Sequence, residues 1–329
     1  MSVRDAIHAL QARLAREVIG QERLLERLII GLLTDSHLLV EGVPGLAKTR
    51  VIKALAQCLD ASFQRIQFTP DLLPSDLTGA DVYYATATQH EFRFKPGPIF
   101  ANIVLADEVN RAPAKVQSAL LEAMAERQVT VGGQTHPLPA LFMVMATQNP
   151  LEHEGTFPLP ESQLDRFVMH LRVDYPSPEV EADIIRLVRG EERAANCGGR
   201  SVPAGSTTNK VTRQQVLSAR GEVGKVHVAE PLERYIIDLV WATRSPADFG
   251  PELTRWIELG ASPRVSIALD RCGRAHAWLQ GRDYVAPEDI RAVAHDVLRH
   301  RLILSYQAQG DGVSTDTVID ELISRVALP

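Results

Sequence analysis

The segment GVPGLAKT, residues 42–49, follows the apolar run His37–Val40 and precedes a helical run from Thr49 to Leu59. A strand, a glycine-rich loop and a helix in this order are typical of a phosphate-binding loop, in which backbone N–H groups surround the phosphates. Lys48 would place its ammonium group on the β- and γ-phosphates, and Thr49 would offer its hydroxyl to Mg²⁺. Ala47 stands where the general pattern has glycine, and it fits there if the backbone is already helical. The alternative is an ordinary glycine turn with an exposed lysine.

A pair of carboxylates ends another apolar run. Asp107 and Glu108 directly follow Ile103–Ala106. Asp107 would bind Mg²⁺ through water, and Glu108 would polarise the attacking water as a general base. Such a pair is weak evidence alone, because a loop or a helix cap also uses it, but beside a phosphate-binding loop it favours a nucleotide site.

An amide side chain follows the next apolar run. Asn149 comes after Leu141–Ala146, and its amide would orient the attacking water by hydrogen bonding, with Gln148 as the second choice. The alternative is a turn asparagine before Pro150.

Two arginines are candidates for contact with the γ-phosphate. We expect Arg166 to reach the nucleotide of a neighbouring subunit as an arginine finger, and the alternative is a surface ion pair with Asp165 or Glu161. Arg264 follows Ser262-Pro263, an N-cap and a first helical position. From there Arg264 would touch the γ-phosphate, although a solvated first-turn arginine is the alternative.

The N-terminal segment predicts an amphipathic helix, with its apolar face formed by Ile7, Leu10, Leu14 and Val18. The run Val18-Ile19-Gly20-Gln21 ends this helix. Val18 and Ile19 would flank an adenine, and Gly20 would let the backbone approach it. A plain helix C-cap is equally consistent with this run.

The order of apolar runs predicts an α/β domain followed by helices. Up to Tyr175, helical stretches alternate with β-type runs at 37–40, 63–68, 103–106, 141–146 and 168–173, which is typical of a parallel sheet covered on both faces. The segments Asp81–Lys95 and Gln128–Leu138 predict β-hairpins. After Pro176 the pattern is helical, with one helix ending near Arg189. The segment Gly190–Lys210 predicts a mobile loop.

Composition limits the classes of function. The 329 residues carry a net charge of −6, which argues against a dedicated nucleic-acid binder. Cys58, Cys197 and Cys272 form no CxxC pair, so we expect reduced thiols in a cytoplasmic protein rather than disulfides or zinc. The N-terminus lacks the pattern of a signal peptide, and no apolar run approaches the roughly 20 residues that span a bilayer, so we expect no membrane insertion.

Taken together, five motifs resemble those of the MoxR family of AAA+ ATPases. They are Gly42–Thr49, Ala106–Pro113, Ala146–Pro150, Leu164–Phe167 and Ala261–Arg264. The family also has alanine at the position of Ala47. The resemblance covers nearly the whole chain, and only Gly190–Lys210 matches nothing that we can assign.

The resemblance implies a role for each motif. Lys48 and Thr49 would belong to Walker A, Asp107 and Glu108 to Walker B, Asn149 would be sensor 1, Arg166 the arginine finger and Arg264 sensor 2. The two hairpins resemble the helix-2 insert and the pre-sensor 1 hairpin of this clade. Residues expected to bind ATP or ADP are Ile19, Gly20, Gly42, Val43, Pro44, Gly45, Leu46, Ala47, Lys48, Thr49 and Arg50, with Mg²⁺ at Thr49 and Asp107.

The resemblance also implies a fold and a class of function. An αβα P-loop NTPase domain with a parallel sheet, residues 1–175, would precede a small all-α lid, residues 176–329. Family members assemble as homo-oligomers, usually hexamers. They use ATP hydrolysis to remodel, mature or insert metal into a protein client, with a von Willebrand factor A domain protein as partner. The alternatives are a nucleotide-gated scaffold with little turnover, a motor subunit like those of magnesium chelatase or Rubisco activase, and a nucleic-acid motor, which the acidic charge disfavours.

Overall fold

The computed structural model describes residues 2–43, 45, 46, 48–85, 90–150, 155–196 and 210–328. The chain forms two compact units. Unit 1 comprises Met1–Ile29, Val40–Pro158 and Arg172–Leu217, and unit 2 comprises Ile30–Leu39, Leu159–Leu171 and Ser218–Pro329. Unit 2 therefore combines two short segments with the C-terminal helices, whereas the sequence predicted a single division after residue 175.

A five-stranded sheet in the order β2–β5–β8–β1–β9 carries the predicted strands. They are β1 (Leu38–Gly42), β2 (Phe63–Gln67), β5 (Ile103–Asp107), β8 (Met143–Gln148) and β9 (Met169–Val173). Strand β5 pairs in parallel with β2 on one side and with β8 on the other. The predicted α/β class and the five β-type runs are confirmed.

Burial along the strands follows their position in the sheet. All five residues of β5 and the first five of β8 are buried, as expected for central strands covered on both faces. In β2, an edge strand, only Ile66 is buried. The carboxyl ends of β5 and β8 lie side by side, so the residues that follow them gather at one edge of the sheet.

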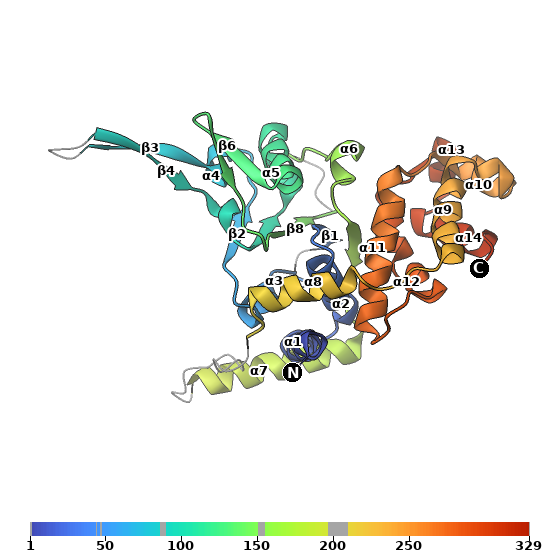
Figure 1. The fold of residues 1–329 in the computed structure, drawn as a ribbon, viewed down its shortest axis with the longest axis horizontal. Coiled ribbons are helices and arrows are strands. Elements are labelled where there is room, and N and C mark those ends of the chain that lie inside the picture. The colour runs from blue at the N-terminus through green and yellow to red at the C-terminus, as the bar shows by residue number, and fades with distance from the viewer. Residues whose placement is uncertain are drawn as a thin grey trace. The chain divides into compact units, whose positions relative to one another are not determined.

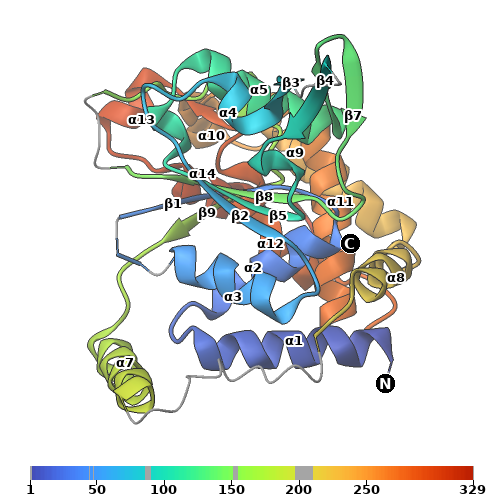
Figure 2. The same ribbon diagram turned by 90° about the vertical axis from the view of Figure 1, so that its left-hand side faces the viewer.

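The sheet of unit 1 has helices on both faces. Figure 2 shows α1 and α3 on one face and α4 and α5 on the other. The helices that begin in this unit are α1 (Val3–Glu17), α2 (Glu22–Leu33), α3 (Lys48–Cys58), α4 (Pro74–Thr78), α5 (Ala114–Glu126), α7 (Pro178–Asn196) and α8 (Arg213–Val223), with 3₁₀ turns η1 (Pro98–Phe100) and η2 (Val109–Arg111). The predicted apolar face of α1 is confirmed, since Ile7, Leu10, Leu14 and Val18 are each at most 2% exposed.

Both predicted hairpins are present in unit 1. Strands β3 (Gly79–Ala85) and β4 (His90–Pro96) pair antiparallel, and Figure 1 shows this hairpin extending away from the sheet. Strands β6 (Gln128–Val131) and β7 (Gln134–Pro137) form the second hairpin. The rings of Phe94 and His136 stack at 3.8 Å and so join the two hairpins.

The predicted loop at Gly190–Lys210 is wrong in its first part. Helix α7 continues to Asn196, beyond the predicted end near Arg189. Glutamate, arginine and alanine dominate this extension and are good helix formers, which outweighs the single Gly190. Residues 197–209 lie outside the described residues.

Unit 2 is mostly helical. Its elements are α6 (Glu161–Leu164), α9 (Glu230–Arg244), η3 (Pro246–Asp248), α10 (Pro251–Trp256), β10 (Ile257–Leu259), α11 (Pro263–Leu279), α12 (Pro287–Leu298), β11 (Ile303–Leu304), α13 (Tyr306–Gly310) and α14 (Thr315–Arg325). The sequence did not predict the short antiparallel pair β10–β11. The expected start of α11 is confirmed, with Ser262 at the N-cap and Pro263 in the first turn. No helix in the described part of the chain is long and apolar enough to cross a membrane.

Candidate functional site

The loop between β1 and α3 contains two glycines with different surroundings. Gly45 has φ +90°, a left-handed conformation that favours glycine, and a Cβ there would meet no atom within 4 Å. At Gly42, a Cβ would lie 2.8 Å from the carbonyl oxygen of Val173. The loop is therefore packed against β9 where it leaves β1 and is open at Gly45. Of the predicted loop residues, Pro44 and Ala47 lie outside the described residues.

Lys48 stands in the first turn of α3, where helix N–H groups favour anions. Its Nζ donates a hydrogen bond of 2.5 Å to the carbonyl oxygen of Gly42. Burial lowers the pKa of the Lys48 ammonium group, and the carboxylates of Asp107, Glu108 and Glu41 act in the opposite direction. Strands β5, β8 and β1 are neighbours in the sheet, so the loop that carries Lys48 after β1 and the carboxylates at the end of β5 lie on the same part of unit 1.

Asp107, at the end of β5, is held by two side chains. Thr147 Oγ1 donates a hydrogen bond of 2.6 Å to Asp107 Oδ1. Arg65 on β2 donates to Asp107 Oδ2 from Nε at 3.0 Å and from Nη2 at 2.6 Å. Both carboxylate oxygens thus have fixed positions, and the negative charge is partly balanced by a guanidinium group.

Glu108 has an unusual backbone conformation. Its φ of 57° and ψ of 51° are left-handed, which costs free energy in a residue that is not glycine. Its N–H donates to Thr147 Oγ1 at 2.9 Å. Its Oε2 accepts hydrogen bonds from Gln67 Nε2 at 2.8 Å and Arg111 Nη1 at 3.0 Å. Gln67 and Arg111 therefore orient the Glu108 carboxylate.

The other residues of unit 1 that the sequence assigned to the nucleotide site differ in burial and in contacts. Asn149 is buried at 6% exposure directly after β8, and Gln148 is half-buried. Arg50 Nε donates to the carbonyl oxygen of Glu17 at 3.0 Å, so it ties the end of α1 to α3. A Cβ on Gly20 would lie 2.2 Å from Val180 Cγ1, so an aliphatic side chain of α7 makes the close approach there.

The two predicted arginines, Arg166 and Arg264, both belong to unit 2 and line one hollow of 270 Å³ in that unit. Arg264 Nη1 lies 3.4 Å from Asp165 Oδ2, which also accepts a hydrogen bond of 3.1 Å from Ser262 Oγ. Arg166, next to Asp165, is exposed. The structure thus brings Arg166 and Arg264 together within unit 2.

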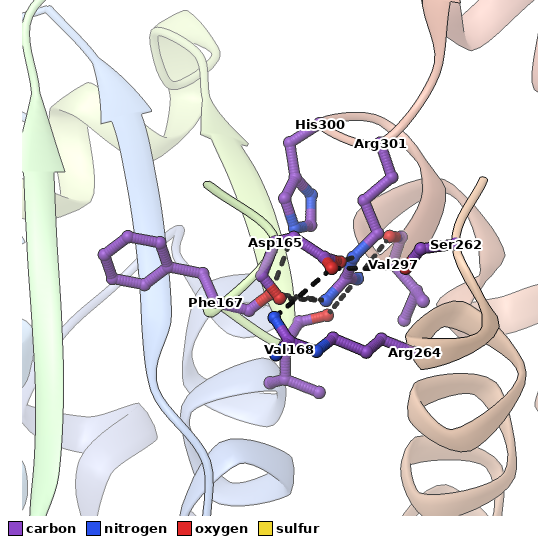
Figure 3. Close-up of polar contacts among 8 residues, drawn as sticks. All are labelled: Asp165, Phe167, Val168, Ser262, Arg264, Val297, His300 and Arg301. Atoms are coloured by element: carbon purple, nitrogen blue, oxygen red, sulfur yellow. Dashed lines mark hydrogen bonds and ion pairs between the residues drawn. The ribbon is translucent and has the colours of Figure 1, made fainter. Parts of the chain in front are cut away.

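A buried arginine, Arg301, organises the segment around Arg166 (Figure 3). Its side chain is 4% exposed, and its Nε donates to Asp165 Oδ1 at 2.7 Å. Its Nη1 donates to the carbonyl oxygens of Val168 and Val297, and its Nη2 to those of Asp165 and Phe167. Arg301 therefore fixes the backbone on both sides of Arg166.

The residues of unit 1 fit a nucleotide and a divalent metal. An open glycine turn and a helix N-terminus suit phosphates, while the hydroxyl of Thr49 and the carboxylate of Asp107 are oxygen ligands of the kind that Mg²⁺ prefers. Lys48 and Thr49 share the first turn of α3, so their side chains start from the same end of the phosphate loop.

Sequence reasoning missed the residues that support the predicted ones. Thr147 bonds both Asp107 and the backbone of Glu108, and Arg65 and Arg301 are bound to carboxylates far away in sequence. Thr147 lies inside the motif Ala146–Pro150, so its position near the end of β8 was a usable signal. Nothing in the local sequence marks Arg65 or Arg301.

Comparisons with known proteins agree with this geometry. A sequence model of the ATPase family associated with various cellular activities (AAA) matches residues 37–169, and one of the AAA lid domain matches residues 254–322. A P-loop sheet followed by a helical lid defines an AAA+ ATPase.

Individual relatives narrow the assignment. Chaperone MoxR1 of Mycobacterium tuberculosis is 45% identical over 318 residues, which cover 95% of this chain and 80% of that protein. The uncharacterized protein YeaC of Bacillus subtilis is 41% identical and is covered to 98%. The crystal structure of a candidate ATPase from Cytophaga hutchinsonii has a TM-score of 0.88 at 46% identity, covering 99% of this chain and 96% of that one. The chain belongs to the MoxR family of AAA+ ATPases, as the five motifs predicted.

Proposed function

We propose that this protein hydrolyses ATP at the site formed by the β1–α3 loop and the carboxyl ends of β5 and β8. One observation supports the proposal above all. The half-buried ammonium of Lys48 shares its surroundings with Asp107 and Glu108, and Thr147 holds both carboxylate residues in place. A cation for phosphates next to two fixed carboxylates is the arrangement that phosphoryl transfer to water requires.

The residues of the loop would bind and orient the nucleotide. The N–H groups around Gly45 and at the start of α3 would surround the phosphates, and Lys48 would exchange its bond to Gly42 for the β- and γ-phosphates. Ile19 and Gly20 would lie near the adenine, now with Val180 as a further apolar neighbour. Mg²⁺, when bound by Thr49 and Asp107, would supply positive charge against the phosphate oxygens.

Glu108 would take a proton from the attacking water. Its carboxylate has two donors, Gln67 and Arg111, which orient it while leaving its other oxygen for water. Asn149, which follows β8, would hold the same water by hydrogen bonding and so act as sensor 1.

The ring and its work on a client extend the proposal. Arg166 would act on the nucleotide of a neighbouring copy, so the protein would be a homo-oligomer, most simply a hexamer. Arg264 would sense the γ-phosphate. The M. tuberculosis relative is named a chaperone, and on that basis we propose remodelling or maturation of a protein client. A von Willebrand factor A domain protein as partner follows from the resemblance to the MoxR family.

Phosphate release tests the hydrolysis. Glu108→Gln is expected to lower turnover at least about 100-fold because the general base is lost, while ATP affinity stays within about two-fold. Lys48→Ala is the matched variant that loses ATP affinity instead. Wild-type protein that binds ATP but releases phosphate no faster than Glu108→Gln would refute the proposal and favour the nucleotide-gated scaffold.

A further inference from the structure

The hollow of unit 2 carries more positive charge than the two predicted arginines supply. Arg166, Arg264, Arg271 and Arg301 line it, together with Ser36 and a small apolar patch. None of the described residues that line it is acidic. We propose that this hollow is a phosphate-binding site, and that Arg271 is a further residue that contacts the terminal phosphates of ATP held by a neighbouring copy.

The charges in the hollow are not equally available to a ligand. Arg301 is committed, because its guanidinium donates five hydrogen bonds within unit 2. Arg264 has only a 3.4 Å contact with Asp165, and its side chain is 62% exposed. Arg271 has no ion-pair or hydrogen-bond partner anywhere in the described part of the chain. Its guanidinium is therefore a charge without a partner among the described residues, in a hollow that three other arginines also line, and such a concentration of positive charge favours an anion.

The neighbouring carboxylate does not neutralise Arg271. Asp270, the residue before it, is paired with Arg274 at 2.5 Å. Arg274 also donates to the carbonyl oxygen of Gly224, and it lines a different hollow of unit 2. On α11, Asp270 and Arg274 thus form a neutral pair, and Arg271 between them remains an unpaired cation among the described residues.

The helix places Arg271 beside Arg264. The two residues are seven positions apart on α11, so they lie on the same face two turns apart, with Ile267 and Ala268 between them. Arg166 lines the same hollow. Arg301 fixes the backbone at Asp165 and Phe167, the residues on either side of Arg166, and Figure 3 shows these contacts. Three exposed guanidinium groups from two rigid elements therefore surround one space.

The class of ligand follows from this geometry. Several guanidinium forks around a small space suit a group with several anionic oxygens, such as a phosphate chain. The assignment to a neighbour's ATP rests on the proposed role of Arg166 as a finger, because the residue that shares a hollow with Arg166 would share its ligand.

Turnover of single variants is the first test. Arg271→Gln is expected to lower the kcat of ATP hydrolysis at least about ten-fold while the dissociation constant for ATP stays within about two-fold, since an arginine on the γ-phosphate acts mainly in the transition state. Arg271→Lys should retain part of that loss, because the charge remains but the fork does not. Arg325→Gln, on α14 of the same unit, removes an exposed arginine that pairs with Glu252 and Glu321; it is the control and should match wild type. Turnover of Arg271→Gln within two-fold of wild type overturns the inference.

Mixed oligomers distinguish a neighbour's ATP from any other anion. Arg271→Gln has an intact nucleotide site, and Lys48→Ala has intact arginines, so about one interface in four of an equal mixture would be complete. Turnover above the sum of the two variants is expected. A mixture of Arg166→Ala with Lys48→Ala should recover in the same way. If the mixture with Arg166→Ala recovers turnover and the mixture with Arg271→Gln does not, the inference on Arg271 is overturned and the proposed role of Arg166 stands. If neither mixture recovers turnover, the proposed role of Arg166 as an arginine finger is overturned as well.

Discussion

Loss of Arg301 is expected to destabilise unit 2 far more than loss of an exposed arginine. In Arg301→Met the aliphatic part of the side chain is kept, and the five donated hydrogen bonds are removed. Those bonds include 2.7 Å contacts to Asp165 Oδ1 and to the carbonyl oxygens of Phe167 and Val297. The side chain is 4% exposed, so water replaces few of them.

The size of the effect follows from what remains. Breaking a buried ion pair by removing one partner costs about 3–5 kcal/mol, because the other charge stays buried. Here Asp165 keeps Ser262 Oγ at 3.1 Å and Arg264 at 3.4 Å, which reduces that cost. The carbonyl oxygens that lose a donor add roughly 1 kcal/mol each, less where water enters. We expect a loss of about 4 kcal/mol in the free energy of unfolding.

Tryptophan fluorescence during urea unfolding measures this loss directly. The chain has three tryptophans, Trp241, Trp256 and Trp278, and all lie in unit 2. With a slope of about 1–3 kcal/mol per molar urea, the midpoint should fall by at least about 1 M. Arg325→Gln, which removes exposed ion pairs with Glu252 and Glu321, is the control and should lose less than about 1 kcal/mol.

Two further variants separate the ion pair from packing. Arg301→Lys keeps the charge but cannot form the fork, so it should lose less than Arg301→Met and more than the control. In the double variant with Asp165→Asn, the losses should be smaller than the sum of the single losses, since both changes act on one pair. A loss below about 1 kcal/mol in Arg301→Met would refute the reasoning.

Three other predictions concern buried polar groups. Thr147→Val, which removes the bonds to Asp107 and to the Glu108 backbone, should lower phosphate release at least about ten-fold and stability by about 1–3 kcal/mol, measured by turnover and urea unfolding. Burial holds the pKa of His300 well below its usual range. The neutral ring therefore supports stability above about pH 6.5, and wild type should lose up to about 1.4 kcal/mol per pH unit as the pH falls below that value. The free energy of unfolding of His300→Gln should depend less on pH below about 6.5. Burial acts to raise the pKa of Asp289, but hydrogen bonds lower it to about 2. Asp289→Asn should lose about 3–5 kcal/mol at pH 7, because the half-buried Arg282 then lacks its charged partner. Wild type should lose about 2 kcal/mol as the pH falls from about 4 toward 2, in line with the lowered pKa.

The sequence predicted those features that local patterns determine. The loop from Gly42 to Lys48 is recognisable because glycine, lysine and a helix start must follow a strand within a few residues. The same holds for Asp107 and Glu108, which end a strand that is apolar throughout. The end of α7 was misjudged because Gly190 was given more weight than the helix formers after it.

The supporting contacts escaped prediction because they join residues that only the fold brings together. Arg65 and Asp107 are 42 positions apart, and Arg301 and Asp165 are 136 positions apart. An isolated arginine gives no sign of whether it will be solvated or will hold a distant carboxylate. Once the hydrogen bonds of the fold are known, however, two arginines of unit 2, Arg301 and Arg271, can be told apart by whether their donors are occupied. Arg301 has every donor occupied and so serves the structure, whereas Arg271 has none occupied by the described residues and faces the same hollow. The donors of Arg271 must be occupied either by solvent or by an anionic ligand. The turnover of Arg271→Gln, alone and in mixed oligomers, decides between the two.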